Sequence, residues 1–339
     1  MLEAKTRAQE EVVDLIKGKK ILYIATKNED YIRIQQEIKL LENHADKVTT
    51  IVSRDKKYLS RIHFVYKKLL LTSVKEYDVI YVSFMAQMIV PFWKWKFQEK
   101  TLIVDFFISI YDTLVDDRKK VVDHSFVAKI LHIVDEWAVK PAKYVISDTQ
   151  VHGKYFRDEF KIPSERLRTL YLEADTSYYH PMKVERPEKW KDKFLVLYFG
   201  SILPVQGVEV ILEAIDLLKE EKDIHFIMIG PIDKKYKKIQ SDTVTYIDWL
   251  KQDDLAKYIS YADLCLAGHF SGTVGKANRT IAGKTYIYQA MGKPIVLGDS
   301  EANRELFAEN DKNIFVKRGD ANVLSETVYQ RYQKDKTEI

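Results

Sequence analysis

The sequence has little glycine and almost no cysteine. Its 339 residues include 12 glycines, about half of the number that an average usage of about 7% would give. Only Gly18 and Gly153 precede position 200, so most close backbone approaches are expected in the second half of the chain. The one cysteine, Cys265, excludes an intrachain disulfide and a cysteine-based zinc cluster, and its apolar neighbours predict a buried side chain. So little cysteine is typical of a reducing compartment, which predicts a cytoplasmic location.

Long apolar runs and a secretion signal are also missing. The longest apolar stretch, residues 79–93, contains Ser83, Gln87 and Pro91, and it is shorter than the roughly 20 residues that a helix needs to span a bilayer. The acidic start MLEAKTRAQEEVVDLI predicts an amphipathic helix and not a signal peptide. We therefore expect a soluble or peripheral protein.

Several common motifs of catalysis and nucleotide binding are absent as well. The sequence has no Gly-x4-Gly-Lys-Ser/Thr, no Gly-x-Gly-x-x-Gly after the first predicted strand, no Gly-x-Ser-x-Gly and no His-Glu-x-x-His. These absences argue against a P-loop nucleotidase, an N-terminal dinucleotide site, a hydrolase of the nucleophile-elbow type and a zinc protease. No acidic metal motif is evident, so we expect neither a metal site nor a cofactor.

What the sequence does contain is an alternation of short apolar runs with segments of helical periodicity. This alternation predicts an α/β fold in which helices cover both faces of parallel sheets. A polar segment with two prolines interrupts it, so we predict two doubly wound, Rossmann-like domains over residues 1–180 and 194–339, joined by a linker at 181–193. Because such sheets bind ligands beyond the carboxyl ends of their strands, a central cleft between the domains is expected to hold the ligand.

Two glycines flank a predicted strand-to-helix turn at the start of the second domain. Gly200 and Ser201 follow the strand, and Gln206 and Gly207 precede the helix. The free N–H groups and the dipole of a helix start can hold an anion there. An ordinary turn that only needs glycine fits this short pattern equally well.

A series of further segments follows in order, and together they carry a resemblance. The segments are FGS…QGVEVILEAIDLL, IHFIMIGP, VTYIDWL, YISYADLCL, QAMGKPIVLGDS and NRELF, with EADTSYYHP in the linker. They resemble the nucleotide-sugar glycosyltransferases of the GT-B fold, in particular the large retaining family four that builds bacterial surface polysaccharides. The resemblance covers nearly all of residues 194–318 and, more loosely, the first half. It implies two domains that face a cleft, with the nucleotide-sugar donor, a UDP-sugar by expectation, held by the C-terminal domain.

The resemblance also implies which residues hold the donor. The backbone around Gly200 and Gly207 would approach the diphosphate, and Glu305 would lie near the ribose or sugar hydroxyls. Residues 246–249 would flank the base, with Tyr246, Ile247 and Asp248 as the predicted site residues.

The chain departs from the family at its charged positions. Ser201 and Gln206 stand where the family has basic residues, and Arg279 and Ile287 stand where its Glu-x7-Glu pair is expected. A diphosphate leaving group still needs its charge neutralised. Lys276, Arg279 and Lys284 lie on a loop rich in glycine, and the segment KANRTIAGK looks like one that precedes a helix in a branch of the family. We predict that these three cations clamp the phosphates; a solvated flexible loop is the alternative.

The first domain is expected to supply the acceptor site and a general base. Asp105 and Asp112 follow a predicted strand, and a carboxylate there can take the proton of an acceptor hydroxyl. Helix capping and a solvated acidic turn are the alternatives. His152, in the segment SDTQVHG after another strand, is the third catalytic candidate, because the family often places a histidine in this domain.

One segment of the first domain is strongly basic. Residues 51–100 hold 10 lysines and arginines against 4 acidic residues, and aromatic residues lie among them in PFWKWKF. Cations mixed with Trp and Phe are typical of contact with anionic lipid, so residues 60–97 are predicted to bind an anionic membrane surface. Nucleic-acid binding or a solvated helix face would give the same pattern, but the resemblance favours the membrane, so no nucleic-acid partner is predicted.

The sequence therefore predicts a glycosyltransferase, peripheral on the inner face of the cell membrane. It would move a sugar from a nucleotide diphosphate to a polyprenyl-linked saccharide during cell-surface polysaccharide assembly, with retention of configuration. Two alternatives stay open. One is an inactive GT-B partner or activator of another transferase, which the missing charged residues suggest. The other is a nucleotide-sugar epimerase of the same architecture.

Overall fold

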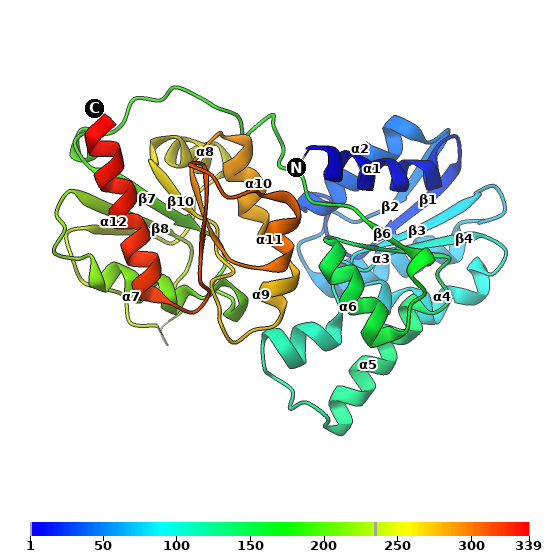
Figure 1. The fold of residues 1–339 in the computed structure, drawn as a ribbon. Coiled ribbons are helices and arrows are strands. Elements are labelled where there is room, and N and C mark those ends of the chain that lie inside the picture. The colour runs from blue at the N-terminus through cyan, green and yellow to red at the C-terminus, as the bar shows by residue number, and fades with distance from the viewer. Residues whose placement is uncertain (1, 234–235, 339) are drawn as a thin grey trace. The chain divides into compact units, whose positions relative to one another are not determined.

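Two parallel sheets organise the chain, each within its own unit (Figure 1). The computed structural model describes residues 2–233 and 236–338. Unit 1 comprises Met1–Glu173 and unit 2 comprises Ala174–Ile339. The predicted α/β fold with two Rossmann-like domains is confirmed.

The sheet of unit 1 has the strand order β2-β1-β3-β4-β5-β6, and all neighbouring strands are parallel. Most of its strands form at short apolar runs, which are buried because helices cover both faces of the sheet, whereas the edge strands β2 and β6 are partly exposed. The strands are β1 (Lys20–Ala25), β2 (Lys47–Ile51), β3 (Val79–Ser83), β4 (Thr101–Asp105), β5 (Tyr144–Ser147) and β6 (Leu167–Thr169).

Successive side chains of each strand point to opposite faces of this sheet, and the side chains of each face pack against a different set of helices. Ile21 and Tyr23 of β1 pack with α1 and α2, whereas Leu22 and Ile24 pack with α3, α4, α5 and α6. The helices are α1 (Leu2–Ile16), α2 (Ile32–His44), α3 (Tyr58–Leu71), α4 (Val90–Phe97), α5 (Phe126–Val139) and α6 (Gln150–Phe160). A π-helix over Asp112–Asp117 lies between β4 and α5.

The last strand of unit 1 differs from the prediction. The sequence predicts a strand over residues 169–172, but β6 ends at Thr169. The carbonyl groups of Leu170 and Tyr171 accept hydrogen bonds from the side chains of Arg33 and Gln36. The two carbonyl groups bind side chains and not a neighbouring strand, so the sheet pairing does not continue through residues 170–172.

The sheet of unit 2 has the order β12-β11-β10-β7-β8-β9 and is also parallel. Its strands are β7 (Phe194–Phe199), β8 (Ile224–Ile229), β9 (Val244–Ile247), β10 (Leu264–Leu266), β11 (Ile295–Gly298) and β12 (Asn313–Val316). Its helices are α7 (Val208–Leu217), α8 (Gln252–Tyr261), α9 (Lys276–Arg279), α10 (Gly283–Ala290), α11 (Glu301–Leu306) and α12 (Ala321–Glu338). Helix α12 packs with α7 on one face of the sheet. Cys265 of β10 is buried, as predicted.

Within residues 2–233 and 236–338, no helix combines the length and the apolar character that crossing a bilayer requires. The same described residues contain no group of three or more His, Cys, Asp and Glu side chains arranged to hold a metal ion.

Candidate functional sites at the strand ends

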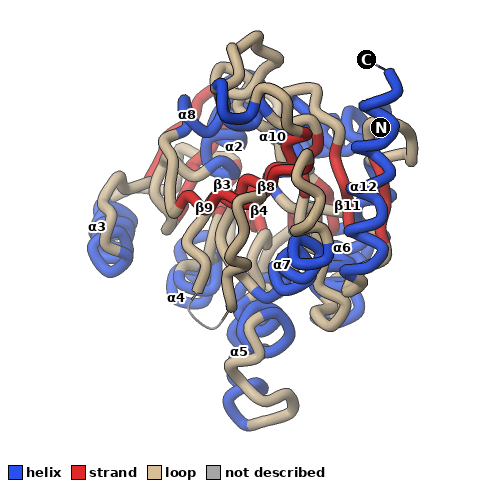
Figure 2. The backbone as a smooth tube through the Cα atoms, turned by 90° about the vertical axis from the view of Figure 1, so that its left-hand side faces the viewer, coloured by secondary structure: helices blue, strands red, loops and turns tan. Residues whose placement is uncertain are grey.

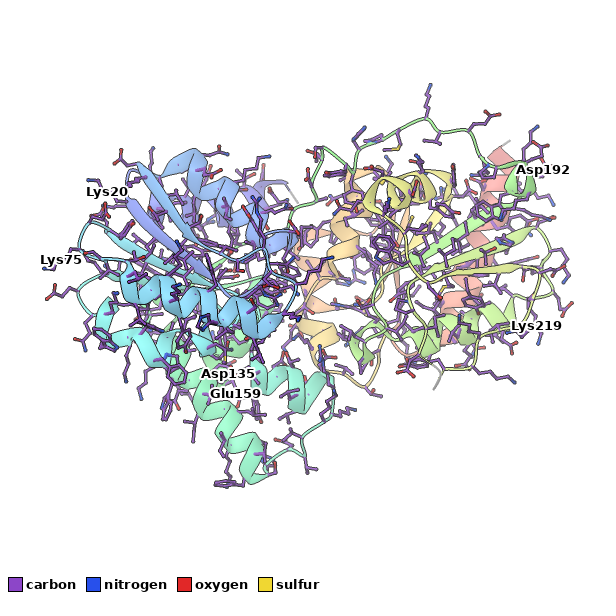
Figure 3. The ribbon with its side chains drawn as sticks, turned by 180° about the vertical axis from the view of Figure 1, so that it is seen from behind. Lys20, Lys75, Asp135, Glu159, Asp192 and Lys219 are labelled. Atoms are coloured by element: carbon purple, nitrogen blue, oxygen red, sulfur yellow. The ribbon has the colours of Figure 1, made fainter. Side chains whose placement is uncertain are left out.

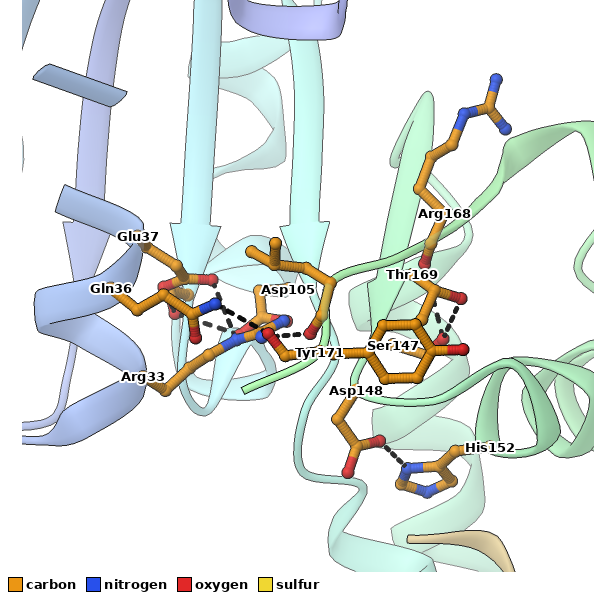
Figure 4. A network of polar contacts seen from close by, with 12 residues as sticks. Arg33, Gln36, Glu37, Asp105, Ser147, Asp148, His152, Arg168, Thr169 and Tyr171 are labelled. Atoms are coloured by element: carbon orange, nitrogen blue, oxygen red, sulfur yellow. Dashed lines mark hydrogen bonds and ion pairs between the residues drawn. The ribbon is translucent and has the colours of Figure 1, made fainter. Parts of the chain in front are cut away.

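Arg33 organises a buried polar network at the carboxyl ends of the strands in unit 1 (Figure 4). Its side chain, on α2, is fully buried, and its Nη2 and Nε donate to the two carboxylate oxygens of Asp105 at 2.8 and 3.2 Å. Glu37, one helical turn later, accepts hydrogen bonds from the hydroxyl groups of Tyr23 and Tyr81 at 2.7 and 2.9 Å. Burial and the Asp105 carboxylate raise the pKa of Glu37 well above its usual range.

This network gives Asp105 a bidentate partner inside the protein. Such an arginine–carboxylate pair fixes both side chains, since the planar guanidinium matches the two carboxylate oxygens. Asp105 is 1% exposed. Its contacts therefore favour a structural role over the catalytic role predicted from the sequence.

The other two predicted catalytic residues of unit 1 lie together. The Nδ1 of His152 is 2.6 Å from an oxygen of Asp148, and its Nε2 is 3.8 Å from Oδ2 of Asp112. His152 lies in the first turn of α6, where the side chain of Thr149 caps the helix by accepting from the N–H of His152. Asp112 begins the π-helix, an element frequent at functional sites.

The environment of His152 favours the charged imidazolium. Burial alone would lower its pKa, but the carboxylates of Asp148 and Asp112 outweigh burial, and the pKa is raised above its ordinary value. His152 and Asp112 are also fully buried, so this charged histidine can exchange a proton with an acceptor group that reaches the buried pair. The structure thus joins Asp112 and His152 into one candidate acid–base site.

The raised pKa of His152 predicts a pH-dependent contribution to stability. A raised folded-state pKa stabilises the fold below the unfolded pKa, about 6.5, and the contribution is lost as the pH rises through the folded value. The melting temperature of His152→Gln should therefore fall furthest below wild type near pH 5.5 and approach it toward pH 9. A difference that stays constant over this range would contradict the charged state of His152.

Asp135 on α5 holds the loop that leads to Asp112, and the sequence did not single it out. Its two oxygens accept from the N–H groups of Ile110 and Tyr111 at 3.1 and 2.8 Å and from the hydroxyl of Ser109 at 2.6 Å. Figure 3 labels Asp135, on α5. The signal in the sequence was an acidic residue, Asp135, at a core-facing position of a largely apolar predicted helix.

Aromatic rings gather at the same strand ends and were also missed. The ring centroid of Tyr31 is 5.2 Å from that of Phe84 and 6.3 Å from that of Phe107, and the Nζ of Lys27 lies 5.3 Å from the Tyr31 ring. Phe84 and the following Met85 have positive φ angles of 42° and 62°. Strained non-glycine backbone is frequent at ligand sites. The three rings make a candidate surface for an acceptor.

Lys284 is the central residue of the candidate site in unit 2. It lies in the first turn of α10 and is buried, and its Nζ donates to Oε1 of Gln206 at 2.5 Å and lies 4.0 Å from the ring centroid of Tyr198. A Cβ atom on Gly200 or Gly268 would come within 3.1 Å of this Nζ. In the part of the chain that the structure describes, no carboxylate lies within ion-pair distance of Lys284.

The pKa of the Lys284 ammonium is lowered well below its usual range. The cause is burial without a counter-ion, because removal from water penalises the charged form. A bound anion would reverse that penalty. Lys284 therefore suits a phosphate-binding role better than a purely structural one.

Close backbone packing, besides the predicted approach to phosphate, explains why position 207 requires glycine. Its φ angle is +64°, and a Cβ there would lie 2.4 Å from the backbone nitrogen of Ser271. The N–H of Phe270 also donates to the carbonyl of Gln206 at 3.1 Å. Glycine is needed at 207 because the loop after β10 packs directly against this turn.

This contact predicts a stability loss for Gly207→Ala. We expect at least about 2 kcal/mol, since the alanine would combine a positive φ with a backbone clash. Gly18 is the matched control: its φ is +66°, and a Cβ added there would have no other atom within 4 Å. Gly18→Ala should cost about 1 kcal/mol. Equal losses in urea unfolding would show that the loop contact is unimportant.

The other predicted donor residues follow strands of the same sheet, but β9 is its edge strand, and β7 and β8 separate β9 from β10. Lys276 and Arg279 lie on α9, which is joined to α11, the helix of Glu305, by hydrogen bonds between Asn278 and Glu301 at 2.8 and 3.1 Å. Three lie at or directly after β9, namely Tyr246, Ile247 and Asp248. Ser201 follows β7 and is exposed.

Comparison with known proteins supports a glycosyltransferase of the GT-B fold. Residues 193–334, within unit 2, match the family described as "Glycosyl transferases group 1". The sucrose-phosphate synthase of Thermosynechococcus elongatus is similar to this chain with a TM-score of 0.65 at 13% identity, over 93% of this chain and 90% of that one. HepE of Anabaena, solved with UDP and glucose, gives 0.63 at 14% identity over 94% and 91%. An alpha-glucosyltransferase solved with UDP-glucose and DNA containing an abasic site gives 0.57 at 12% identity over 93% and 90%. No curated protein sequence matches the chain.

Proposed function

We propose that this protein transfers a sugar from a UDP-sugar to a lipid-linked saccharide acceptor during cell-surface polysaccharide assembly. The observation that carries the donor assignment is the buried ammonium of Lys284, which has Gln206 as its hydrogen-bond acceptor and glycines around it. The UDP and UDP-glucose bound by HepE, which is similar in structure, support a UDP-sugar.

Lys284 supplies the charge that is missing at two other donor positions. Ser201 and Gln206 occupy the places where a diphosphate would otherwise find cations, and Gln206 instead holds the Lys284 Nζ. As the bond between the sugar and the diphosphate breaks, negative charge develops on the departing phosphate oxygens. Lys284 neutralises this charge in a partly desolvated site, and Lys276 and Arg279 on α9 complete the clamp.

Unit 1 supplies the acceptor site in this proposal. The rings of Tyr31, Phe84 and Phe107 pack against the acceptor saccharide, and the pair of Asp112 and His152 acts on its hydroxyl group. Retention of configuration follows the family-four resemblance.

A membrane contact would bring the enzyme to a lipid-linked acceptor. Helices α3 and α4 expose Leu70, Leu71, Phe92 and Trp95 next to lysines of the basic segment 60–97. Trp93 and Phe97, which the sequence pattern groups with them, are buried in the core of unit 1. In this proposal the contact uses the outer side of these helices, and the protein lies on the inner face of the cell membrane, where the sequence resemblance predicts it.

Calorimetry with UDP, GDP and dTDP tests the proposal. We expect UDP to bind, and Lys284→Met to weaken its binding. No binding of any nucleotide would favour an inactive partner protein. Incubation with UDP-sugars and no acceptor, followed by NMR, tests the other alternative, because an epimerase would convert the donor to a different sugar nucleotide.

A further inference from the structure

Helix α5 exposes an apolar stripe that the proposed function leaves without a role. Phe126, Ile130, Ile133 and Trp137 have exposed fractions of 78, 44, 42 and 58%. Their spacing of four, three and four residues places them on one side of the helix. Val122, 79% exposed, lies in the segment before it. Single exposed apolar side chains are common, but a contiguous group of this kind marks an interaction surface.

The opposite side of α5 is firmly attached to unit 1. Ala128 and Ala138 are buried there, and the carboxylate of Asp135 accepts four hydrogen bonds from the adjacent loop and from Gln87. The side chain of Ser125 caps the first turn by accepting from the N–H of Ala128. Figures 1 and 2 show the first turns of α5 projecting away from the sheet of unit 1. The stripe therefore belongs to a well-formed helix whose inner face is already packed.

Basic residues outnumber acidic residues around the stripe. The exposed basic run 118–120 precedes Val122, and exposed Lys129 lies within about 60° of Phe126 around the helix. Over the whole stripe, positions 118–140, five cations stand against three acids, Asp123, Asp135 and Glu136, of which Asp135 is buried. A second copy of the stripe would bring cations to cations, whereas anionic lipid supplies the complementary charge.

We propose that α5, with residues 118–125, docks on an anionic membrane. The stripe inserts among the lipid headgroups, and the basic run contacts lipid phosphates. The proposal rests on the proposed function only in its choice of a membrane that carries the acceptor. It extends the surface of residues 60–97, because α4 packs beside α5 on the same face of the sheet.

Docking through α5 would also set the distance from the membrane to the candidate acid–base site. The hydrogen bonds that Asp135 accepts from the N–H groups of Ile110 and Tyr111 join the inner side of α5 to the residues directly before Asp112. A membrane-bound α5 would therefore hold Asp112 at a fixed height above the lipid.

A dye at position 133 tests insertion directly. The natural Cys265 is buried, and burial raises the pKa of its thiol, so a dye would label an added surface cysteine selectively. With the dye at Ile133→Cys, we expect a blue-shifted emission on phosphatidylglycerol vesicles and none on phosphatidylcholine vesicles. The dye at Leu217→Cys, an exposed position on α7 of unit 2, should not shift on either.

Vesicle sedimentation measures the contribution of the stripe and of the basic run. The double variant Ile133→Asp with Trp137→Asp should bind phosphatidylglycerol vesicles at least about tenfold more weakly than wild type, because two apolar side chains no longer enter the interface. Lys119→Glu with Lys120→Glu should also bind more weakly and depend less on salt than wild type, since the cations of segment 60–97 remain. Leu217→Asp is the matched control and should bind like wild type.

Three results would overturn the proposal. They are vesicle binding by the stripe variants at the wild-type level, no vesicle binding by wild type, and a wild-type dimer in light scattering that the stripe variants abolish.

UDP calorimetry on the same proteins tests the membrane proposal and the proposed sugar-transfer function separately. Vesicle binding without UDP binding would refute the donor assignment alone, and UDP binding without vesicle binding would refute the membrane assignment alone.

Discussion

Lys284→Met should lower kcat/KM for the donor sugar by about 100- to 1,000-fold, the loss that follows removal of one group that stabilises charge in the transition state. The ammonium of Lys284 is buried beside Gly200, Gly268 and Gln206 and has no ion-pair partner within the described residues. Methionine keeps the length and the apolar stem of the side chain but removes its charge. The measurement is the rate of sugar transfer, or of UDP release from the donor, at varied donor concentration.

The melting temperature of Lys284→Met distinguishes a donor-binding role of Lys284 from a structural role. Burial of a lone ammonium is unfavourable, so Lys284→Met should melt at or above the wild-type temperature while its activity falls. Lys257→Met, on α8 with its ammonium 3.3 Å from Asp254, is the matched control and should change neither property. A Lys284→Met enzyme with full activity would remove Lys284 from the donor site.

The fold could be predicted because most strands are buried on both faces and therefore read as short apolar runs. IHFIMI of β8 and VIYVS of β3 are fully buried. The failure at β6 has a specific cause. Leu170 and Tyr171 are as apolar as a strand, but their carbonyl groups bind side chains of α2 that are 137 and 135 residues away in the sequence. Local patterns do not contain such partners.

The candidate site was predictable only where residue type and local position were sufficient. Lys284 stood out as a cation at a predicted helix start, and His152 as a histidine directly after a strand. The structural constraint on Gly207 depends on a loop that begins 60 positions later, and the role of Asp105 depends on Arg33, 72 positions earlier. Tertiary contacts decide whether an acid at a strand end meets solvent or a buried arginine.

Arg33→Met should destabilise unit 1 by about 3–5 kcal/mol, which is the cost of removing one partner of a buried ion pair. Arg33 is fully buried, and its loss would remove the guanidinium donors of Asp105 and of the Leu170 carbonyl, leaving Asp105 the Ser83 hydroxyl at 3.3 Å. Urea unfolding of the full chain, followed by circular dichroism, measures the change. Lys47→Met, which removes a lysine from an exposed pair with Glu76, is the control and should cost less than about 1 kcal/mol.

The double variant Arg33→Met with Asp105→Asn decides whether Asp105 is structural or catalytic. If the two side chains act as a buried pair, the second substitution removes the charge that the first leaves uncompensated, so the double variant should be more stable than the sum of the single losses predicts. Asp105→Asn alone should then lose both stability and activity, because the network that positions the strand ends is weakened. An Asp105→Asn protein with wild-type stability but severely reduced kcat would instead make Asp105 the catalytic carboxylate.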